Sequence, residues 1–276
     1  MTDIAFIGGG NMAQSLIGGL CKAGTPASSI HVAEPRQEAC ETLRRNTSVV
    51  CTAANSEAVQ SAGLWVFAVK PQVLRAVCQE LAPIAQQQHP QILSIAAGIR
   101  SDQIDRWLNG GQSIVRAMPN TPALLGAGAT GLFANAQTQV SGRDTSERVM
   151  ATVGKTVWVE DEALIDTVTA LSGSGPAYLF LLAEAMENAA VAQGLPRDAA
   201  RLLAAQTVLG AGRMLTESGD SAELLRQRVT SPGGTTAAAL EIFHNGGFSE
   251  LVSTALGAAA QRGTELAELA EIQPAP

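Results

Sequence analysis

A glycine-rich turn near the start of the chain constrains the fold more than any other feature. The segment Gly8-Gly9-Gly10-Asn11-Met12-Ala13 stands between the apolar run 4–7 and a stretch, 11–23, whose apolar residues have helical spacing. This order predicts a strand, a tight turn and a helix, and it fits the pattern G-x-G-x-x-G/A with alanine last. Gly8 permits the sharp turn, Gly10 permits a pyrophosphate to approach the backbone, and the small Ala13 permits close packing of helix and strand. The pattern predicts dinucleotide binding on the first amides of the helix. The alternative is a glycine turn in an α/β domain that binds no nucleotide.

The first half of the chain continues this alternation of apolar runs and helical stretches. The runs are continuous in character, as strands buried on both faces of a parallel sheet require. The predicted strands are 4–7, 30–33, 49–51, 64–68, 92–96 and 114–117. We therefore predict a doubly wound α/β domain over residues 1–160.

The second half, residues 161–276, is rich in alanine and has no run typical of a strand. It predicts an all-helical domain, with helices at 176–192, 197–217, 221–228, 235–243 and 248–270. The segment 176–192 is charged only at Glu184 and Glu187, so it is apolar almost all round. A helical domain of ~110 residues rarely covers such a helix by itself. We therefore expect this helix to be buried against a second subunit.

The charge balance excludes several classes of partner. The formal net charge is −7 and the chain has only three lysines, which gives no basic surface for nucleic acid or an anionic membrane. No stretch reaches the ~18 apolar residues of a membrane helix, and the start of the chain does not resemble a signal peptide. We expect a cytoplasmic protein.

Neither the histidines nor the cysteines predict a metal site. The three histidines do not stand beside other ligand types at metal-binding spacing, so we expect no bound metal. No two cysteines have the two-residue spacing of a zinc or redox motif. We expect all four to be buried, reduced thiols, as is usual in the cytosol.

Two features near the ends of predicted strands point to a nicotinamide cofactor. Glu34 could accept a hydrogen bond from a ribose 2′-hydroxyl, which favours NAD, whereas Arg36 could pair with a 2′-phosphate, which favours NADP. The segment Ala68-Val-Lys-Pro71 follows another buried strand, and Lys70 is expected near the cofactor or exposed to solvent. Small or proline-stiffened turns at 94–98 and 118–122 are expected to form a floor beneath the nicotinamide.

The segment Val229-Thr-Ser-Pro-Gly-Gly-Thr-Thr236 links two predicted helices. It combines hydroxyl groups with two glycines at a helix N-terminus, an arrangement suited to binding a carboxylate. A simple N-terminal cap is the alternative. The run of small and polar residues is longer than a cap needs, and this favours the binding interpretation.

The chain resembles the pyrroline-5-carboxylate reductases over essentially its whole length. The matching segments are 6–12, 68–71, 94–98, 116–122, 171–178 and 229–236. The last two together are specific to this family. The resemblance implies an N-terminal Rossmann domain, a C-terminal helical dimerisation domain, and often a ring of five dimers. It also implies NAD(P)H-dependent reduction of L-1-pyrroline-5-carboxylate to L-proline.

The resemblance further implies which residues bind cofactor and substrate. The cofactor would contact residues on several strand ends, namely Gly8, Gly9, Gly10, Asn11, Met12, Glu34, Arg36, Asn55, Ala68, Val69, Lys70, Pro71, Ile95, Ala96 and Ala97. We expect NADPH or NADH, with NADPH slightly preferred. The substrate would contact Glu162, Ser231, Gly233, Gly234, Thr235 and Thr236. Arg228 departs from the family pattern, because some relatives carry there an asparagine that contacts the nicotinamide ribose.

Imine reduction needs little acid catalysis, because a protonated imine accepts a hydride readily and the amine formed is basic. The site must orient the reactants and hydrogen-bond the ring nitrogen and the carboxylate. We assign Thr236 as the catalytic hydroxyl at the ring nitrogen. A β-hydroxyacid dehydrogenase is disfavoured, since the helix after Gly175 lacks the lysine that such enzymes use. Reduction of larger cyclic imines and a non-catalytic nucleotide sensor are the remaining alternatives.

Overall fold

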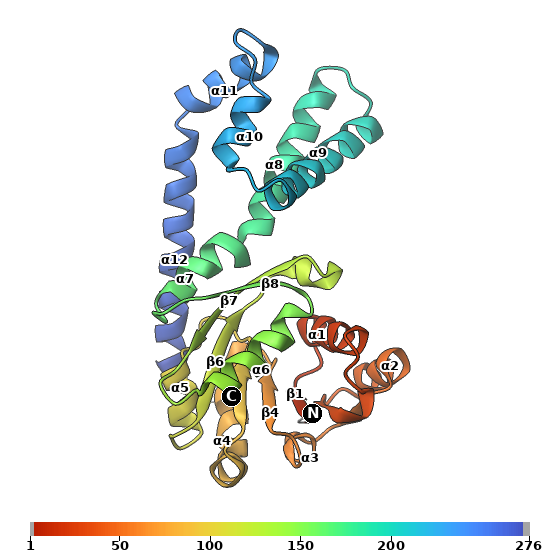
Figure 1. Ribbon diagram of the computed structural model, residues 1–276, viewed down its shortest axis with the longest axis vertical. Helices are drawn as coiled ribbons and strands as arrows, with labels where there is room; N and C mark the ends of the chain where they lie inside the picture. Colours follow the sequence, from red (N-terminus) through yellow and green to blue (C-terminus); the bar gives the residue numbers. More distant parts are fainter. Residues whose placement is uncertain (1–2, 273–276) are drawn as a thin grey trace. The chain divides into compact units, whose positions relative to one another are not determined.

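The computed structural model describes residues 3–272. Within them a single eight-stranded sheet has the order β3-β2-β1-β4-β5-β6-β7-β8 (Figure 1). The strands are β1 (Ile4–Ile7), β2 (Ile30–Ala33), β3 (Val50–Thr52), β4 (Leu64–Phe67), β5 (Gln91–Ser94), β6 (Ser113–Met118), β7 (Gly128–Ala134) and β8 (Gly154–Trp158). The first six confirm the predicted strands to within two residues, and the doubly wound α/β class is confirmed.

Helices cover both faces of this sheet. Alternate strand residues point to opposite faces, and because both sets are apolar, each face needs a covering layer. Ile4 and Phe6 of β1 belong to one buried cluster, and Ala5 and Ile7 belong to the other. The first cluster includes residues of α1 (Asn11–Lys22), α2 (Gln37–Thr47) and α6 (Val140–Ala151). The second includes residues of α3 (Asn55–Val59), α4 (Pro71–Gln88) and α5 (Ser101–Trp107).

The strands β7 and β8 are absent from the sequence prediction. Gly131 lies inside β7, where a Cβ would come within 2.6 Å of Val168 Cγ1, so close packing requires a residue that is rare in strands. The strand β8 is at the sheet edge, with Lys155 and Val157 exposed, and therefore lacks a continuous apolar run. β7 is antiparallel to β6 because its connection, through η2 (Thr121–Leu125), is too short for a parallel crossover.

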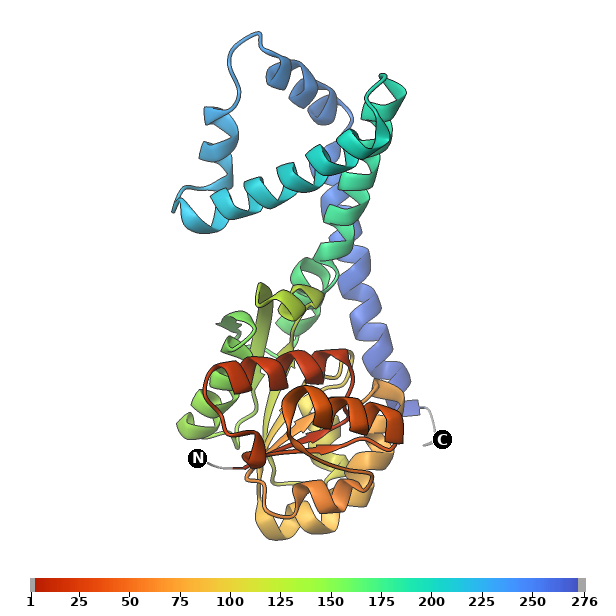
Figure 2. The same ribbon diagram turned by 90° about the vertical axis from the view of Figure 1, so that its right-hand side faces the viewer.

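The second half of the chain is helical, as predicted. After α7 (Leu164–Val168) and the π-helical turn η3 (Thr169–Gly173), helices α8 (Gly175–Ala192) and α9 (Arg197–Glu217) form a hairpin, teal in Figure 2. The remaining helices are α10 (Ala222–Arg228), α11 (Thr235–Asn245) and α12 (Phe248–Ile272). These five helices begin and end within two residues of their predicted bounds.

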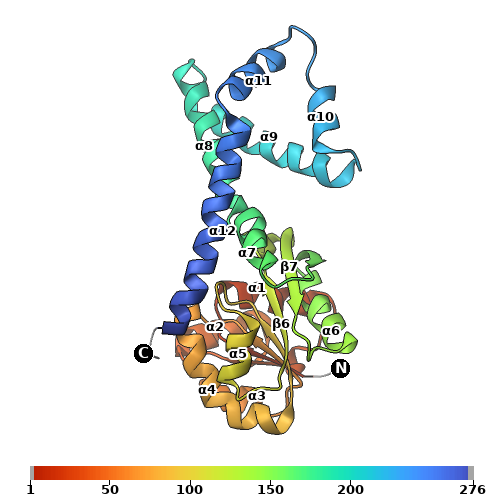
Figure 3. The same cartoon turned by 90° about the vertical axis from the view of Figure 1, so that its left-hand side faces the viewer.

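The compact units divide differently from the predicted boundary at 160/161. Gly175–Gly257 form a helical unit, whereas the chain up to Ser174 and from Ala258 onward forms the nucleotide-fold unit. Ile165 of α7 is buried, and Ala270 in the C-terminal half of α12 packs against the cluster of α4 and α5 (Figure 3). Residues 161–174 and the end of α12 therefore complete the core of the first unit.

The expectation of four reduced thiols is wrong for one pair. Cys40 of α2 and Cys51 of β3 form a disulfide, with 5.8 Å between their Cα atoms. The short turn between α2 and β3 brings an inward-facing helix residue beside an inward-facing strand residue, which sequence spacing alone does not indicate. Cys21 and Cys78 are free; Cys78 is buried as expected, whereas Cys21 is only half-buried.

Within residues 3–272 no helix has the length and apolar character needed to cross a membrane.

Candidate functional site

The turn between β1 and α1 has the geometry that its glycines predict. Gly8 has a φ of +101°, and a Cβ at this position would lie 2.7 Å from the carbonyl oxygen of Ala68. Its backbone N–H donates to the carbonyl of Ala33 over 2.9 Å. Gly8 therefore brings the ends of β1, β2 and β4 into close contact, which a residue with a side chain would prevent.

The start of α1 is open. Gly10 is the N-cap residue of α1, no side chain caps it, and nothing lies within 4 Å of the position that a Cβ would take. The first N–H groups of a helix lack intrahelical partners, and the helix dipole is positive at that end. The backbone at Gly10, Asn11 and Met12 therefore fits a pyrophosphate group, with Gly10 leaving room for its approach.

Glu34 and Arg36 form a bonded pair next to this turn. The buried Glu34 carboxylate accepts hydrogen bonds from the Gly9 N–H at 3.2 Å and the Arg36 N–H at 3.1 Å. It also accepts two from the Arg36 guanidinium, at 2.8 Å from Nε and 3.1 Å from Nη2. Burial acts to raise the pKa of Glu34, but the bonds and charge of Arg36 outweigh it and hold the pKa below its ordinary value. Glu34 is therefore ionised at neutral pH.

The other residues predicted to bind cofactor gather at the same edge of the sheet. Ala68–Lys70 follow β4, Pro71 begins α4, and Ile95–Ala97 follow β5. Asn55 begins α3, and its Nδ2 donates to Glu80 Oε2 over 2.8 Å. Because parallel strands place their carboxyl ends together, the structure brings all fifteen predicted cofactor residues to the edge where such folds bind ligands.

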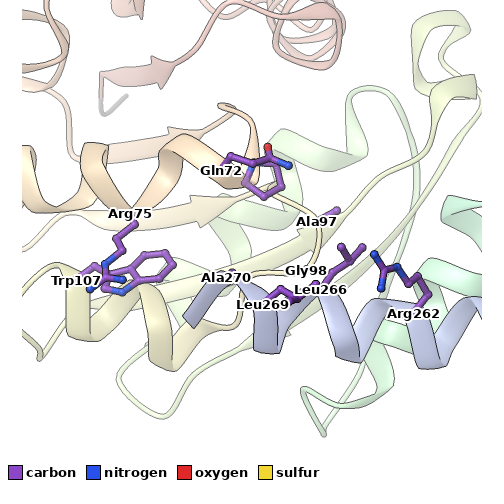
Figure 4. A pocket seen from close by; sticks show the side chains of 10 residues that line it. Gln72, Arg75, Ala97, Gly98, Trp107, Arg262, Leu266, Leu269 and Ala270 are labelled. Atoms are coloured by element: carbon purple, nitrogen blue, oxygen red, sulfur yellow. The ribbon is translucent and has the colours of Figure 1, made fainter. Parts of the chain in front are cut away.

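A cavity of about 340 Å³ opens beside this edge, between α4, α5 and the C-terminal half of α12 (Figure 4). Pro71 and Ala97 belong to its wall, so it adjoins the predicted nicotinamide region. Trp107 and Leu266 provide apolar surface, and Arg262 lies towards one end in the close-up.

Glu162 lies in the same unit, and its carboxylate is engaged there. Oε1 accepts from the Ser101 N–H at 2.6 Å and from Arg116 Nη1 at 3.1 Å, and Oε2 accepts from Ser101 Oγ at 2.6 Å. Arg116 and Ser101 had no role in the sequence prediction. The available signal was an arginine inside an apolar strand, which requires a buried counter-charge.

The predicted substrate residues of the second half belong to the helical unit. Ser231, Gly233 and Gly234 lie in the turn before α11, while Thr235 and Thr236 begin that helix. Gly233 has a φ of +69°, and the Gly234 N–H donates to the Ser231 carbonyl over 3.0 Å. Ser231 to Gly233 and Thr235 are exposed, and Thr236 is half-buried. The turn thus presents hydroxyl groups and helix N–H groups together, which suits a carboxylate.

Arg228, the departure from the family pattern, lies at the end of α10. Its guanidinium pairs with Asp220.

The fold and the phosphate turn define a nicotinamide-dinucleotide-dependent oxidoreductase. Family models match at both ends of the chain: "NADP oxidoreductase coenzyme F420-dependent" over residues 3–98, and "Pyrroline-5-carboxylate reductase dimerisation" over residues 162–266. Among curated proteins, the pyrroline-5-carboxylate reductase of Pseudomonas aeruginosa is 49% identical, with 96% of this chain and 97% of the relative covered. That of Pisum sativum is 38% identical, with 95% of each covered.

Solved structures agree with these matches. The pyrroline-5-carboxylate reductase of Coxiella burnetii superposes with a TM-score of 0.93 at 42% identity, covering 96% of this chain and 98% of that one. That of Plasmodium falciparum, solved with NADP bound, gives 0.83 at 26% identity with the same coverage. The chain belongs to the pyrroline-5-carboxylate reductase family.

Proposed function

We propose that this protein reduces the cyclic imine L-1-pyrroline-5-carboxylate to L-proline with NADPH or NADH, the last step of proline biosynthesis. The observation that carries the proposal is the open phosphate turn at Gly8–Met12. It lies at the sheet edge where the parallel strands end, together with the other ten residues expected to contact the cofactor. Relatives with this reductase name cover nearly the whole chain, and one was solved with NADP bound.

The residues of the nucleotide-fold unit would bind and orient the cofactor. Gly10, Asn11 and Met12 would hold the pyrophosphate, and Glu34 with Arg36 would hold the adenosine ribose. The segments 68–71 and 95–97 would contact the nicotinamide half. When bound, the nicotinamide supplies the hydride that the imine carbon accepts. We propose that both cofactors serve, with NADPH slightly preferred, which the relative solved with NADP bound supports.

The turn 231–236 would bind the substrate. Its N–H groups and hydroxyls suit the carboxylate, and we propose that the Thr236 hydroxyl hydrogen-bonds the ring nitrogen. The reaction adds a hydride to the carbon and leaves the proton on the nitrogen, so the protein needs to supply orientation more than acid catalysis. The side chain of Glu162, which we expected near the substrate, makes its hydrogen bonds inside the nucleotide-fold unit.

We also propose that the helical unit forms a homodimer and that five dimers form a ring. The match to a dimerisation family over residues 162–266 supports the dimer. The helix α8 contains no buried residue in the single chain, although it is apolar, and this supports burial against a second copy. The cytoplasmic location expected from the sequence stays a prediction.

Oxidation of NADPH and NADH at 340 nm, with L-1-pyrroline-5-carboxylate as the second substrate and proline identified as the product, tests the activity. We expect turnover with both cofactors. If only a six-membered cyclic imine is reduced, that imine and not L-1-pyrroline-5-carboxylate is the substrate. Cofactor binding without turnover of either ring would instead favour a nucleotide sensor.

A further inference from the structure

Glu162 joins three segments of the nucleotide-fold unit. We infer that Glu162, together with Arg116, is a positioning residue that holds the segment 95–101 in the conformation that binds the nicotinamide half of the cofactor. The inference rests on the proposed function, because that function makes 95–97 a cofactor contact. It differs from the role that the family resemblance suggests for Glu162, which is direct contact with the substrate.

The hydrogen bonds of Glu162 fix the point where the segment enters α5. Both Ser101 donors, the backbone N–H and Oγ, lie 2.6 Å from the carboxylate oxygens. Ser101 is buried, and the Glu162 side chain is 18% exposed. A carboxylate that accepts two bonds from one residue determines both the position and the rotation of that residue's backbone. Ser101 is four residues from Ala97, so this bond restrains the segment at its far end.

Arg116 makes this arrangement an ion pair with a buried cation. Arg116 lies in β6 beside Ser94 of β5, and its side chain is 4% exposed. Nη1 is 3.1 Å from Glu162 Oε1, and Nη2 is 3.9 Å from Asp166 Oδ1. A buried guanidinium requires a compensating charge, so the pair ties the start of α7 to the sheet as well. Arg116 of the sheet therefore fixes the position of Glu162, and Glu162 in turn fixes the position of Ser101.

Further contacts restrain the segment along its length. The Ile95 N–H donates to the Phe67 carbonyl over 3.1 Å, which fixes the near end. Gly98 has a φ of +69°, and a Cβ there would come within 3.2 Å of Leu266 Cβ, so the chain runs close to α12 (Figure 4). Gln103 accepts from the Arg100 N–H at 2.7 Å and donates to the Ala267 carbonyl at 3.0 Å. The segment thus has one defined path, and the bonds to Glu162 lie at its exit.

The two roles of Glu162 predict different kinetics. A side chain that contacts the substrate changes the KM for the imine, while a side chain that shapes the nicotinamide segment changes cofactor affinity even when no imine is present. Glu162→Gln removes the charge and places an amide N–H₂ against donors, so it disturbs Ser101 and Arg116 together. Glu160→Gln is the matched control, because it makes the same chemical change two residues away, at an exposed position.

The test measures NADPH affinity by calorimetry without imine, followed by steady-state kinetics and a thermal melt. For Glu162→Gln we expect the NADPH Kd to rise ~10-fold and kcat to fall ~10-fold, with the imine KM at saturating NADPH within about twofold. Ser101→Ala should also raise the NADPH Kd and lower kcat, but by smaller factors, since the backbone hydrogen bond and the ion pair remain. The variant that combines Glu162→Gln with Ser101→Ala should have the same NADPH Kd and kcat as Glu162→Gln alone, because both changes remove the same interaction.

Two results would overturn the inference. One is a rise in imine KM without a change in NADPH Kd, which would assign Glu162 to the substrate. The other is a wild-type Kd and kcat in both Glu162→Gln and Ser101→Ala. If Glu162→Gln is unfolded in the melt, Ser101→Ala decides the matter, since it keeps the buried charges paired. The NADPH Kd does not depend on which imine is reduced, so failure of the proposed reaction would be distinguishable from failure of this inference.

Discussion

The carboxylate of Glu34 and the guanidinium of Arg36 act as a pair, so neither can be read alone as the choice between NAD and NADP. A 2′-phosphate adds close to two negative charges beside the ionised Glu34. Glu34→Gln should therefore raise the ratio of kcat/KM for NADPH over NADH by ~10-fold, and Arg36→Ala should lower it by a similar factor. Because the pKa of Glu34 is lowered, the carboxylate should keep its charge between about pH 6 and 8, so Glu34 itself should add no pH dependence to this selectivity in that range.

The control for this pair is Gln37→Ala, an exposed neighbour whose change should leave the ratio unaltered. Equal losses for NADH and NADPH in Arg36→Ala would show that Arg36 serves only to hold Glu34.

Thr236 carries the one hydroxyl that we assign to the chemistry. Thr236→Ala should lower kcat/KM for the imine by ~10-fold or more, because a hydrogen bond to the ring nitrogen is lost in the transition state. Thr236→Ser keeps the hydroxyl and should retain most of the activity, and cofactor affinity should not change in either variant. Steady-state kinetics of both variants make the measurement. Unchanged kinetics in Thr236→Ala would remove this side chain from the mechanism.

At the junction of two elements, β1 and α1, a single substitution should weaken cofactor binding without affecting folding. Gly10 has a φ of −68° and open space where a Cβ would project, so Gly10→Ala should fold as well as the wild type. The added methyl group would lie where the pyrophosphate approaches, and we expect the NADPH Kd to rise at least ~10-fold. Thermal melts and calorimetry make the comparison.

Gly18→Ala is the matched control in the same helix. It also meets nothing within 4 Å, and alanine favours a helix interior over glycine by about 1 kcal/mol, so this variant should be stabilised and should bind normally. A normal Kd in Gly10→Ala would contradict the assignment of the phosphate turn.

Elements whose burial matches their local pattern could be predicted from the sequence. The four residues of β1 and the four of β4 are buried and apolar, and α9 has the predicted bounds. β7 could not be predicted, because Gly131 interrupts its apolar pattern. The glycine is required by close contact with Val168, which is 37 positions away and so outside the local pattern. The contacts of Glu162 could not be predicted for the same reason, since Ser101 and Arg116 come close to it only in the folded protein. Local periodicity predicts elements, whereas contacts between distant segments require the structure.

For the whole molecule, the apolar surface of the helical unit is the feature that a single chain leaves unexplained. Phe180 and Leu181 in α8 are 68% and 66% exposed, although large exposed apolar patches are unusual in a monomer. Burial of such side chains contributes about 25 cal/mol for each Å² removed from water, which favours association through this helix. The wild-type mass in light scattering should therefore be at least twice the 28.5 kDa of one chain, and ten times that value for a ring of five dimers.

Leu181→Asp tests whether α8 is the surface of association. A charge buried between two subunits is costly, so the variant should shift towards the monomer mass and lose activity at dilute concentration. Val140→Asp is the control, because Val140 is 73% exposed at the start of α6, outside the helical unit. If Leu181→Asp keeps the wild-type mass, another face must join the subunits. If both variants dissociate, association would depend on general surface charge instead of on α8.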